Sequence, residues 1–288
     1  MWPHNYASTR NKERVREEDT KLIKKEYFRK ERKLTYLGMP SGEMRDILAW
    51  QNFFERCTAV EIESDSRNEL VLNTIRNNLS DKVKILFGDI QEILIKGEDN
   101  FKNKLEFPYD IVFLDFFGTI IYKGLRRVEA IENLIKKQKG NSFLFLLTFN
   151  IKERRYCKNE VNSVFDKIQK HISSFFITSK EAKEEIQNII AGYKAKETHE
   201  MYRQKLFVPY FIKTFAEATG FKTHCYAPIF YLGYSRSPMI HFAFKLSYEP
   251  YSSTKAISDQ SLIDIVNINI KKATKGRISV MREQMPHL

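Results

Sequence analysis

The sequence predicts an α/β fold built on a Rossmann-like, doubly wound sheet, and three observations support this prediction. Short apolar runs recur between residues 34 and 115, separated by segments long enough for helices. Each run ends in a glycine or an acid, as at the carboxyl edge of a parallel sheet, where ligands bind. Two long apolar segments, 223–232 and 239–246, have the character of a C-terminal antiparallel hairpin. We expect about seven strands, this hairpin and a helical insertion.

The composition suits one large domain with extensions and favours a polyanionic partner. The chain has 288 residues, of which 42% are hydrophobic, enough for a sizeable core. Its formal net charge of +12 favours nucleic acid over neutral metabolites. A general enrichment in lysine would give the same charge balance without a nucleic-acid partner, and this alternative stays open.

The cysteines and the hydropathy bear on metal sites and on the cellular compartment. Cys57, Cys157 and Cys225 lie far apart, without the spacing of a metal site or a disulfide framework. The N-terminus lacks the apolar core of a signal peptide, and no apolar run is long enough to span a bilayer. We therefore expect a cytoplasmic protein with no metal ion and no membrane partner.

The charge pattern divides the chain into a central domain and two basic ends. Residues 1–33 form a basic N-terminal arm, residues 34–250 the sheet domain, and residues 251–288 a basic C-terminal extension. Residues 151–207 interrupt the alternation of strands and helices, and we expect them to form a helical insertion. The arm is either a solvated helix that covers one edge of the domain or a segment that contacts phosphates.

The first apolar run leads into a glycine-rich turn and then into a helix predicted over about residues 43–54. The turn contains Gly38, Met39, Ser41 and Gly42. Glycines at these places permit a tight turn and let a ligand approach the N–H groups at the helix start. An ordinary strand-to-helix turn has the same pattern.

The second and third strands end in acids that suit a nucleoside. Glu61 follows the glycine turn by roughly 20 residues, where a carboxylate can accept hydrogen bonds from both ribose hydroxyls. The third strand leads into Asp89, which can bind an exocyclic amine, and Ile90, which can pack on a purine ring. The alternatives are an exposed strand end for Glu61 and an ordinary turn for Asp89.

The fourth strand, residues 111–114, runs into Asp115, Phe116, Phe117 and Gly118. A carboxylate at a sharp strand exit places a hydrogen-bond acceptor beside an aromatic face, on which an extruded base could stack. The alternative is that Asp115 caps the turn and that both rings belong to the core. A helix, a fifth strand and, after the insertion, another helix complete the alternation before the hairpin.

This layout resembles the class I S-adenosylmethionine-dependent methyltransferases, whose Rossmann-like sheet ends in a hairpin with its last strand inserted antiparallel. The resemblance covers residues 34–247 outside the insertion. It implies S-adenosyl-L-methionine as the cofactor. The residues implied to bind it are Gly38, Met39, Ser41 and Gly42 at its methionine end, Glu61 at its ribose, and Asp89 and Ile90 at its adenine.

The exit of the fourth strand implies the substrate. Amino-methylating members of the family carry Asp/Asn-Pro-Pro-Tyr there, or Asp-Pro-Phe-Gly in some tRNA guanine methyltransferases. The resemblance therefore implies methylation of an RNA or DNA base amine, with Asp115 as the catalytic residue and Phe116, Phe117 and Gly118 at the substrate.

Two alternatives to this function stay open. One is a methyltransferase of a protein or a small molecule, for which the basic surface is incidental. The other is a non-catalytic nucleic-acid-binding protein on the same fold. Tyr36 stands where the first motif of the family has an acid, and Phe116 stands where the fourth has a proline.

Overall fold

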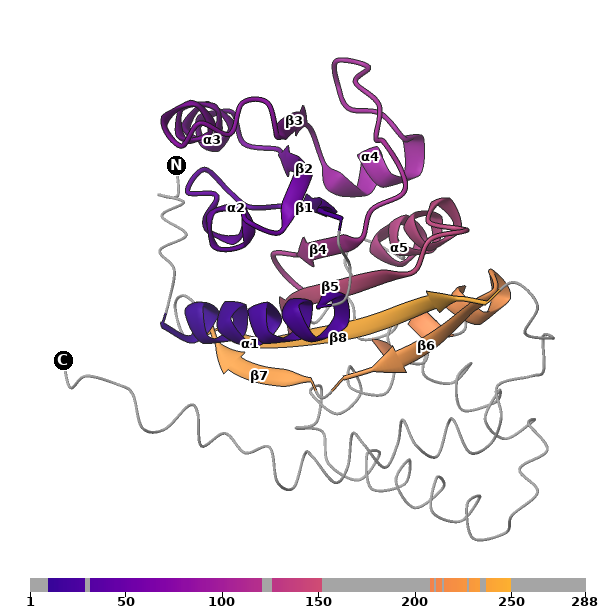
Figure 1. Ribbon diagram of the computed structural model, residues 1–288. Helices are drawn as coiled ribbons and strands as arrows, with labels where there is room; N and C mark the ends of the chain where they lie inside the picture. The colour runs from indigo at the N-terminus through magenta and orange to yellow at the C-terminus, as the bar shows by residue number, and fades with distance from the viewer. Residues whose placement is uncertain are drawn as a thin grey trace, which may run out of the picture.

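The computed structural model shown in Figure 1 describes residues 10–28, 32–120, 126–151, 208–209, 211–213, 215–226, 228–233 and 237–249. The predicted insertion beyond residue 151 and the predicted C-terminal extension lie outside these residues. Apart from residue 227, the described part contains the strands of the predicted sheet, and it contains all of the candidate site residues.

The described residues form one eight-stranded sheet in the order β3-β2-β1-β4-β5-β8-β6, with β7 also paired to β8 (Figure 1). Five strands are parallel: β1 (Leu34–Gly38), β2 (Phe54–Glu61), β3 (Val83–Phe87), β4 (Ile111–Asp115) and β5 (Phe143–Asn150). The long strand β8 (Pro238–Tyr248) lies antiparallel between β5 and β6 (Phe221–Cys225). The predicted α/β fold with a C-terminal antiparallel hairpin is confirmed.

The eighth strand arises because the predicted strand 223–232 is interrupted. Its second half is β7 (Ile229–Leu232), which pairs with β8 like its first half, β6. From the pair Cys225–Phe244 to the pair Ile229–His241, the register advances four positions on one side and three on the other. This shift by one residue is a bulge, and Pro228 has no N–H to give to the ladder.

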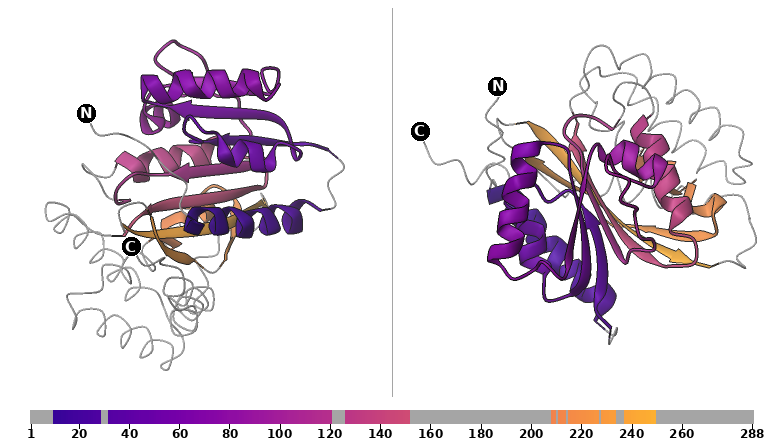
Figure 2. Two further views of the ribbon diagram at one scale, coloured as in Figure 1. Left: turned by 90° about the vertical axis from the view of Figure 1, so that its left-hand side faces the viewer. Right: turned by 90° about the horizontal axis from the view of Figure 1, so that it is seen from above.

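Helices cover both faces of the sheet (Figure 2). One face carries α1 (Arg10–Tyr27), α2 (Arg45–Trp50) and α3 (Ser64–Arg76), and the other carries α4 (Ile90–Lys96) and α5 (Arg126–Lys137). Alternate residues of each strand therefore enter two separate apolar cores. In β4, for example, Val112 and Leu114 pack beneath α4 and α5, whereas Ile111 and Phe113 pack beneath α1 and α2.

The helix after the glycine-rich turn is shorter than the predicted segment 43–54. Ser41 and Met44 both have positive φ values, 56° and 44°, so the chain turns twice before α2 begins. At the other end, β2 already begins at Phe54. The turn thus brings α2 tightly against β1, with Met44 and Trp50 buried in the core beneath it.

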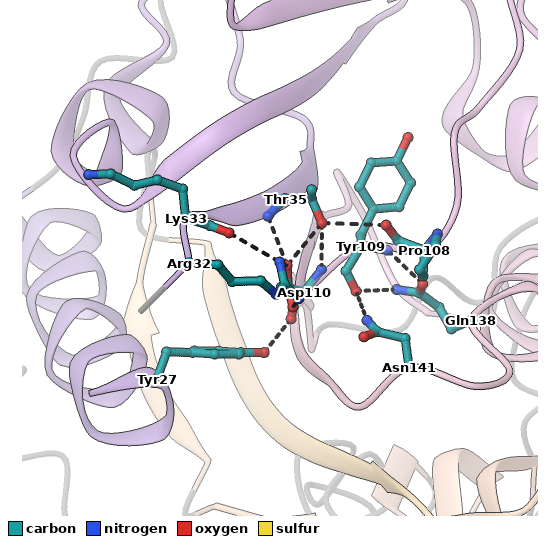
Figure 3. Close-up of polar contacts among 9 residues, drawn as sticks. All are labelled: Tyr27, Arg32, Lys33, Thr35, Pro108, Tyr109, Asp110, Gln138 and Asn141. Carbon is teal, nitrogen blue, oxygen red and sulfur yellow. Dashed lines mark hydrogen bonds and ion pairs between the residues drawn. The ribbon is translucent and has the colours of Figure 1, made fainter. Parts of the chain in front are cut away.

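A network around Asp110 ties α1 to the amino edge of the sheet (Figure 3). The Asp110 carboxylate is 1% exposed and accepts hydrogen bonds from Arg32 Nη1 and Nη2 at 2.9 and 2.6 Å. It also accepts from the backbone N–H and the hydroxyl of Thr35 at 3.0 and 3.1 Å. The Tyr27 hydroxyl donates to the carbonyl oxygen of Asp110. One residue thus joins the end of α1, the segment after it and the starts of β1 and β4.

We expect Asp110→Ala to lower the free energy of unfolding by about 3 kcal/mol, because it leaves the buried Thr35 N–H without its acceptor and Arg32 without its partner. Urea unfolding of the full chain measures this change. The matched control is Glu106→Ala, which removes an exposed partner of Arg56 and Lys84 and is expected to cost less than about 1 kcal/mol. Equal effects of the two substitutions would contradict the structural role of Asp110.

Candidate active site

The predicted site residues gather at the carboxyl edge of the sheet. Gly38, the last residue of β1, pairs with Ala59 of β2 and Phe113 of β4. Glu61, the last residue of β2, accepts a backbone hydrogen bond from Gly88 N at 3.0 Å. Because neighbouring parallel strands end together, the glycine-rich turn, Glu61, the loop after β3 and Asp115 all lie along one edge.

The acids at the tips of β2 and β3 order their own loops. Glu61 Oε1 accepts from the backbone N–H groups of Ile62 and Glu63, at 2.8 and 2.9 Å. Asp89 caps α4 by accepting a hydrogen bond from Gln91 N at 2.9 Å. Asp89 therefore has the structural role in a turn that was the alternative to ligand binding. Ile90 is buried in the core beneath α4. Both carboxylates are thus held at adjacent strand tips by backbone hydrogen bonds.

Side chains of the protein itself fill the space beside both turn glycines. A Cβ built on Gly38 would lie 2.1 Å from Tyr36 Oη, and a Cβ built on Gly42 would lie 2.3 Å from Glu69 Oε2. At each position, a larger residue would collide with a side chain of the protein itself, so glycine is favoured there without any ligand. Met39 packs partly buried against the core beneath α4 and α5.

The hydroxyl of Tyr36 is a buried polar group at this turn. Tyr36 is fully buried, and its hydroxyl has no hydrogen-bond partner among the described residues. Burial first, and then the charge of Asp46, raise the pKa of Tyr36 well above its usual value. The phenol therefore keeps its proton, and its O–H is a hydrogen-bond donor with no acceptor among the described residues.

Asp115 ends β4 and carries an ion pair at the carboxyl edge of the sheet. Its Oδ2 lies 2.6 Å from Lys12 Nζ, and the two side chains are 22% and 30% exposed. The charge of Asp115 raises the pKa of Lys12, against the opposing effect of burial. At neutral pH, Lys12 is thus an ammonium group beside the carboxylate.

The two rings after Asp115 have different surroundings. Phe116 is buried in the core, with the Arg127 guanidinium 4.8 Å from its ring centroid. Phe117 is 76% exposed. Gly118 has a φ of 93°, a left-handed conformation that favours glycine, and its carbonyl oxygen accepts a hydrogen bond from Asn150 N at 2.9 Å. Of the two rings, Phe117 is the one that offers a face to a planar ligand.

Within the predicted basic arm, residues 10–27 form α1, which packs against the sheet domain. Buried residues recur every four positions along it, at Val15, Asp19, Ile23 and Tyr27. The end of α1 nearer the site is held by polar pairs: besides Lys12 and Asp115, Arg16 Nε lies 2.6 Å from Asp46 Oδ1. These contacts were not predicted from the sequence, because their partners lie 30 or more positions apart.

A buried chain of hydrogen bonds continues from α1 into the sheet. Asp19 Oδ1 lies 2.9 Å from His241 Nε2, and Thr148 Oγ1 lies 2.8 Å from His241 Nδ1. Thr148 is the register partner of Asp115, so this chain ends beside the candidate catalytic residue. Within the described ranges, no group of three His, Cys, Asp or Glu residues could hold a metal ion, and no helix is long and apolar enough to cross a membrane.

No protein-family model matches the sequence, and no curated protein matches it. Among solved structures, similar chains include the methyltransferase domain of bacterial CtHen1, at 12% identity over 81% of this chain and 98% of that one, with a TM-score of 0.43. Another is the O-methyltransferase TomG from Streptomyces achromogenes, solved with S-adenosylmethionine, at 10% identity over 85% and 83%, with a TM-score of 0.46. A third is an S-adenosylmethionine-dependent methyltransferase from Agrobacterium tumefaciens, at 15% identity over 50% and 48%, with a TM-score of 0.36.

We expect Arg16→Ala to destabilise the protein by about 3 kcal/mol near pH 8, because it leaves Asp46 buried without its partner. Burial raises the pKa of Asp46, and Arg16 opposes that rise, so the pKa is higher still in the variant. A carboxyl with a higher pKa in the folded than in the unfolded state binds more protons when folded. The variant therefore gains stability as the pH is lowered from about 8 toward the range in which the folded state takes up a proton at Asp46.

Urea unfolding at several pH values measures this dependence. The control is the double variant Arg16→Ala/Asp46→Asn, which has no carboxyl at position 46 and should lose the additional pH dependence. A pH profile of Arg16→Ala parallel to that of the unmodified chain would show that Asp46 does not titrate in this way.

Proposed function

We propose that this protein is an S-adenosylmethionine-dependent methyltransferase that acts on an amino group of a nucleic-acid base. The observation that carries the proposal is the row of groups along one sheet edge: the glycine-rich turn, Glu61, Asp89, and Asp115 beside the exposed ring of Phe117. Acids at successive strand tips suit a nucleoside-containing cofactor. The net charge of +12 suits a polyanionic substrate.

The residues present fit this cofactor. Glu61 would hold its ribose and Asp89 its adenine amine. At the other end, the buried Tyr36 hydroxyl, which has no partner among the described residues, would donate to its carboxylate. Glu69, whose carboxylate lies against Gly42, would supply the negative charge that a cofactor ammonium group needs. When bound, the cofactor supplies a methyl group activated by a sulfonium centre.

The chain itself would act mainly by positioning. Asp115 would accept a hydrogen bond from the target amine and orient its lone pair, and Phe117 would stack on the base and fix its plane. Alignment of this kind can supply a large part of the acceleration in a direct displacement. The ionised carboxylate would also stabilise the positive charge that develops on the amine nitrogen.

A second candidate function, a non-catalytic nucleic-acid-binding protein, is favoured by one observation. Lys12 is bound to Asp115, and Tyr36 and Glu69 fill the spaces beside the two turn glycines. A site filled by its own side chains suits a protein that has kept the fold and lost the cofactor. Direct measurement of cofactor binding distinguishes the two functions.

We expect S-adenosylmethionine to bind the full chain in a calorimetric titration, and Glu61→Ala to weaken this binding by about tenfold or more, since it removes a charged acceptor of the ribose hydroxyls. Glu63→Ala is the matched control. Glu63 is two residues further on and exposed, and its side chain does not cap α3, so its replacement should leave the affinity unchanged. An absence of binding at millimolar cofactor would favour the non-catalytic candidate.

We expect Asp115→Asn to reduce methyl transfer about a hundredfold, because the neutral amide no longer stabilises the charge on the amine. A tritiated-methyl assay on total RNA, DNA and protein measures the rate and identifies the substrate class. Cofactor affinity in the same variant should stay unchanged, since Asp115 is assigned to the substrate. Label in protein alone would contradict the nucleic-acid part of the proposal.

A further inference from the structure

Lys12 is held beside Asp115, at the carboxyl edge of the sheet, because its helix packs against the domain. One turn further along α1, Arg16 is bound to Asp46, and nearly two turns further, Asp19 is bound to His241. The apolar residues Ile23 and Tyr27 bury the far end of the same helix. The lysine side chain therefore extends from a fixed backbone position toward Asp115.

Lys12 and Asp115 present a hydrogen-bond donor and an acceptor side by side. An ammonium group can only donate and an ionised carboxylate can only accept. The two atoms lie 2.6 Å apart, and both side chains are partly exposed, so an incoming ligand can reach them. Their mutual contact uses one of the three N–H groups of the ammonium and one of the two oxygens of the carboxylate. A ligand edge could therefore contact both without separating them.

We propose that Lys12 is a specificity-determining residue: with Asp115, it recognises a Watson–Crick edge on which an exocyclic amine stands next to a ring-nitrogen acceptor. Adenine, through its N6 amine and N1, and cytosine, through its N4 amine and N3, have this edge. Asp115 accepts from the amine and Lys12 donates to the ring nitrogen. The inference rests on the proposed function, and it narrows the substrate to these two bases.

The other two bases lack this arrangement on their Watson–Crick edges. Guanine places an N1–H donor beside its N2 amine, so Lys12 would face a donor. Uracil and thymine have no exocyclic amine for Asp115. Because a mismatched donor or acceptor loses a hydrogen bond to a charged group, the discrimination should be large enough to measure.

The test measures the equilibrium affinity of the full chain, without cofactor, for fluorescent oligonucleotides of twelve residues. Each has uracil at every position except one central test base, and each is made as RNA and as DNA. We expect central adenine or cytosine to bind about tenfold more tightly than guanine or uracil. Replacing N1 of adenine or N3 of cytosine by carbon, in 1-deazaadenine or 3-deazacytosine, keeps the amine and should remove the preference. This atomic substitution probes the contact assigned to Lys12.

The variants separate this role from general charge. Lys12→Met should lose the preference for adenine and cytosine and should bind the deaza bases as well as the natural ones. Lys12→Arg keeps a donor, so it should retain the base preference and the sensitivity to the deaza substitution. The control is Lys21→Met, because Lys21 carries the same charge on α1 but is exposed and paired with Glu18 instead of Asp115. It should keep the base preference while weakening the binding of every oligonucleotide equally.

Three results would overturn the inference: no base preference in the unmodified chain, a preference that survives the deaza substitution or Lys12→Met, or tighter binding by Lys12→Met. The last would identify the ammonium as a competitor for Asp115. Failure of the proposed function is recognised separately, as an absence of S-adenosylmethionine binding in calorimetry, because the base preference is measured without cofactor.

Discussion

The short strand β4 holds both ends of α1, and the arrangement of the site depends on this constraint. Asp110, just before the strand, binds Arg32 and accepts from Tyr27 at one end, and Asp115, its last residue, binds Lys12 at the other. Lys12 and Tyr27 are 15 positions apart, about 22 Å along a helix, and Asp110 and Asp115 are five apart, about 17 Å along a strand. The lengths differ by about 5 Å, which the side chains of the paired residues can span. The helix therefore extends from the amino edge of the sheet to its carboxyl edge.

The two anchors of α1 differ in physical character. At the amino edge, apolar burial of Ile23 and Tyr27 accompanies the Asp110 network. At the carboxyl edge, the helix is held mainly by ion pairs and by a small apolar cluster of Val15, Tyr231 and Met239. Buried and partly buried ion pairs contribute little net stability, but they fix geometry, because each charge requires its own partner. This suits a helix that has to place one ammonium group accurately at the site.

The periodicity of the sequence was sufficient to predict the sheet and to place the candidate residues along one edge of it, because buried strands and their glycine or acid ends are local signals. The bulge at Pro228 and the short α2 were not predicted, since register and left-handed turn residues depend on packing. The contacts of Lys12 and Arg16 were also missed. The buried positions of α1 recur every four residues, and Asp19 is one of them. Because Asp19 is charged, the sequence alone does not indicate that this position is buried; its partner, His241, lies far away in the chain.

The central claim is that the carboxyl edge of the sheet binds a complete S-adenosyl group, with Tyr36 at its amino-acid end. The most direct measurement is a calorimetric titration of the full chain and of Tyr36→Phe with S-adenosylhomocysteine and with 5′-methylthioadenosine, which lacks the amino-acid end. We predict that the unmodified chain binds S-adenosylhomocysteine about tenfold or more tightly than it binds 5′-methylthioadenosine. Tyr36→Phe should reduce this difference in affinity and leave the affinity for 5′-methylthioadenosine unchanged. No binding of either nucleoside at millimolar concentration, or an unchanged difference in Tyr36→Phe, would contradict the claim.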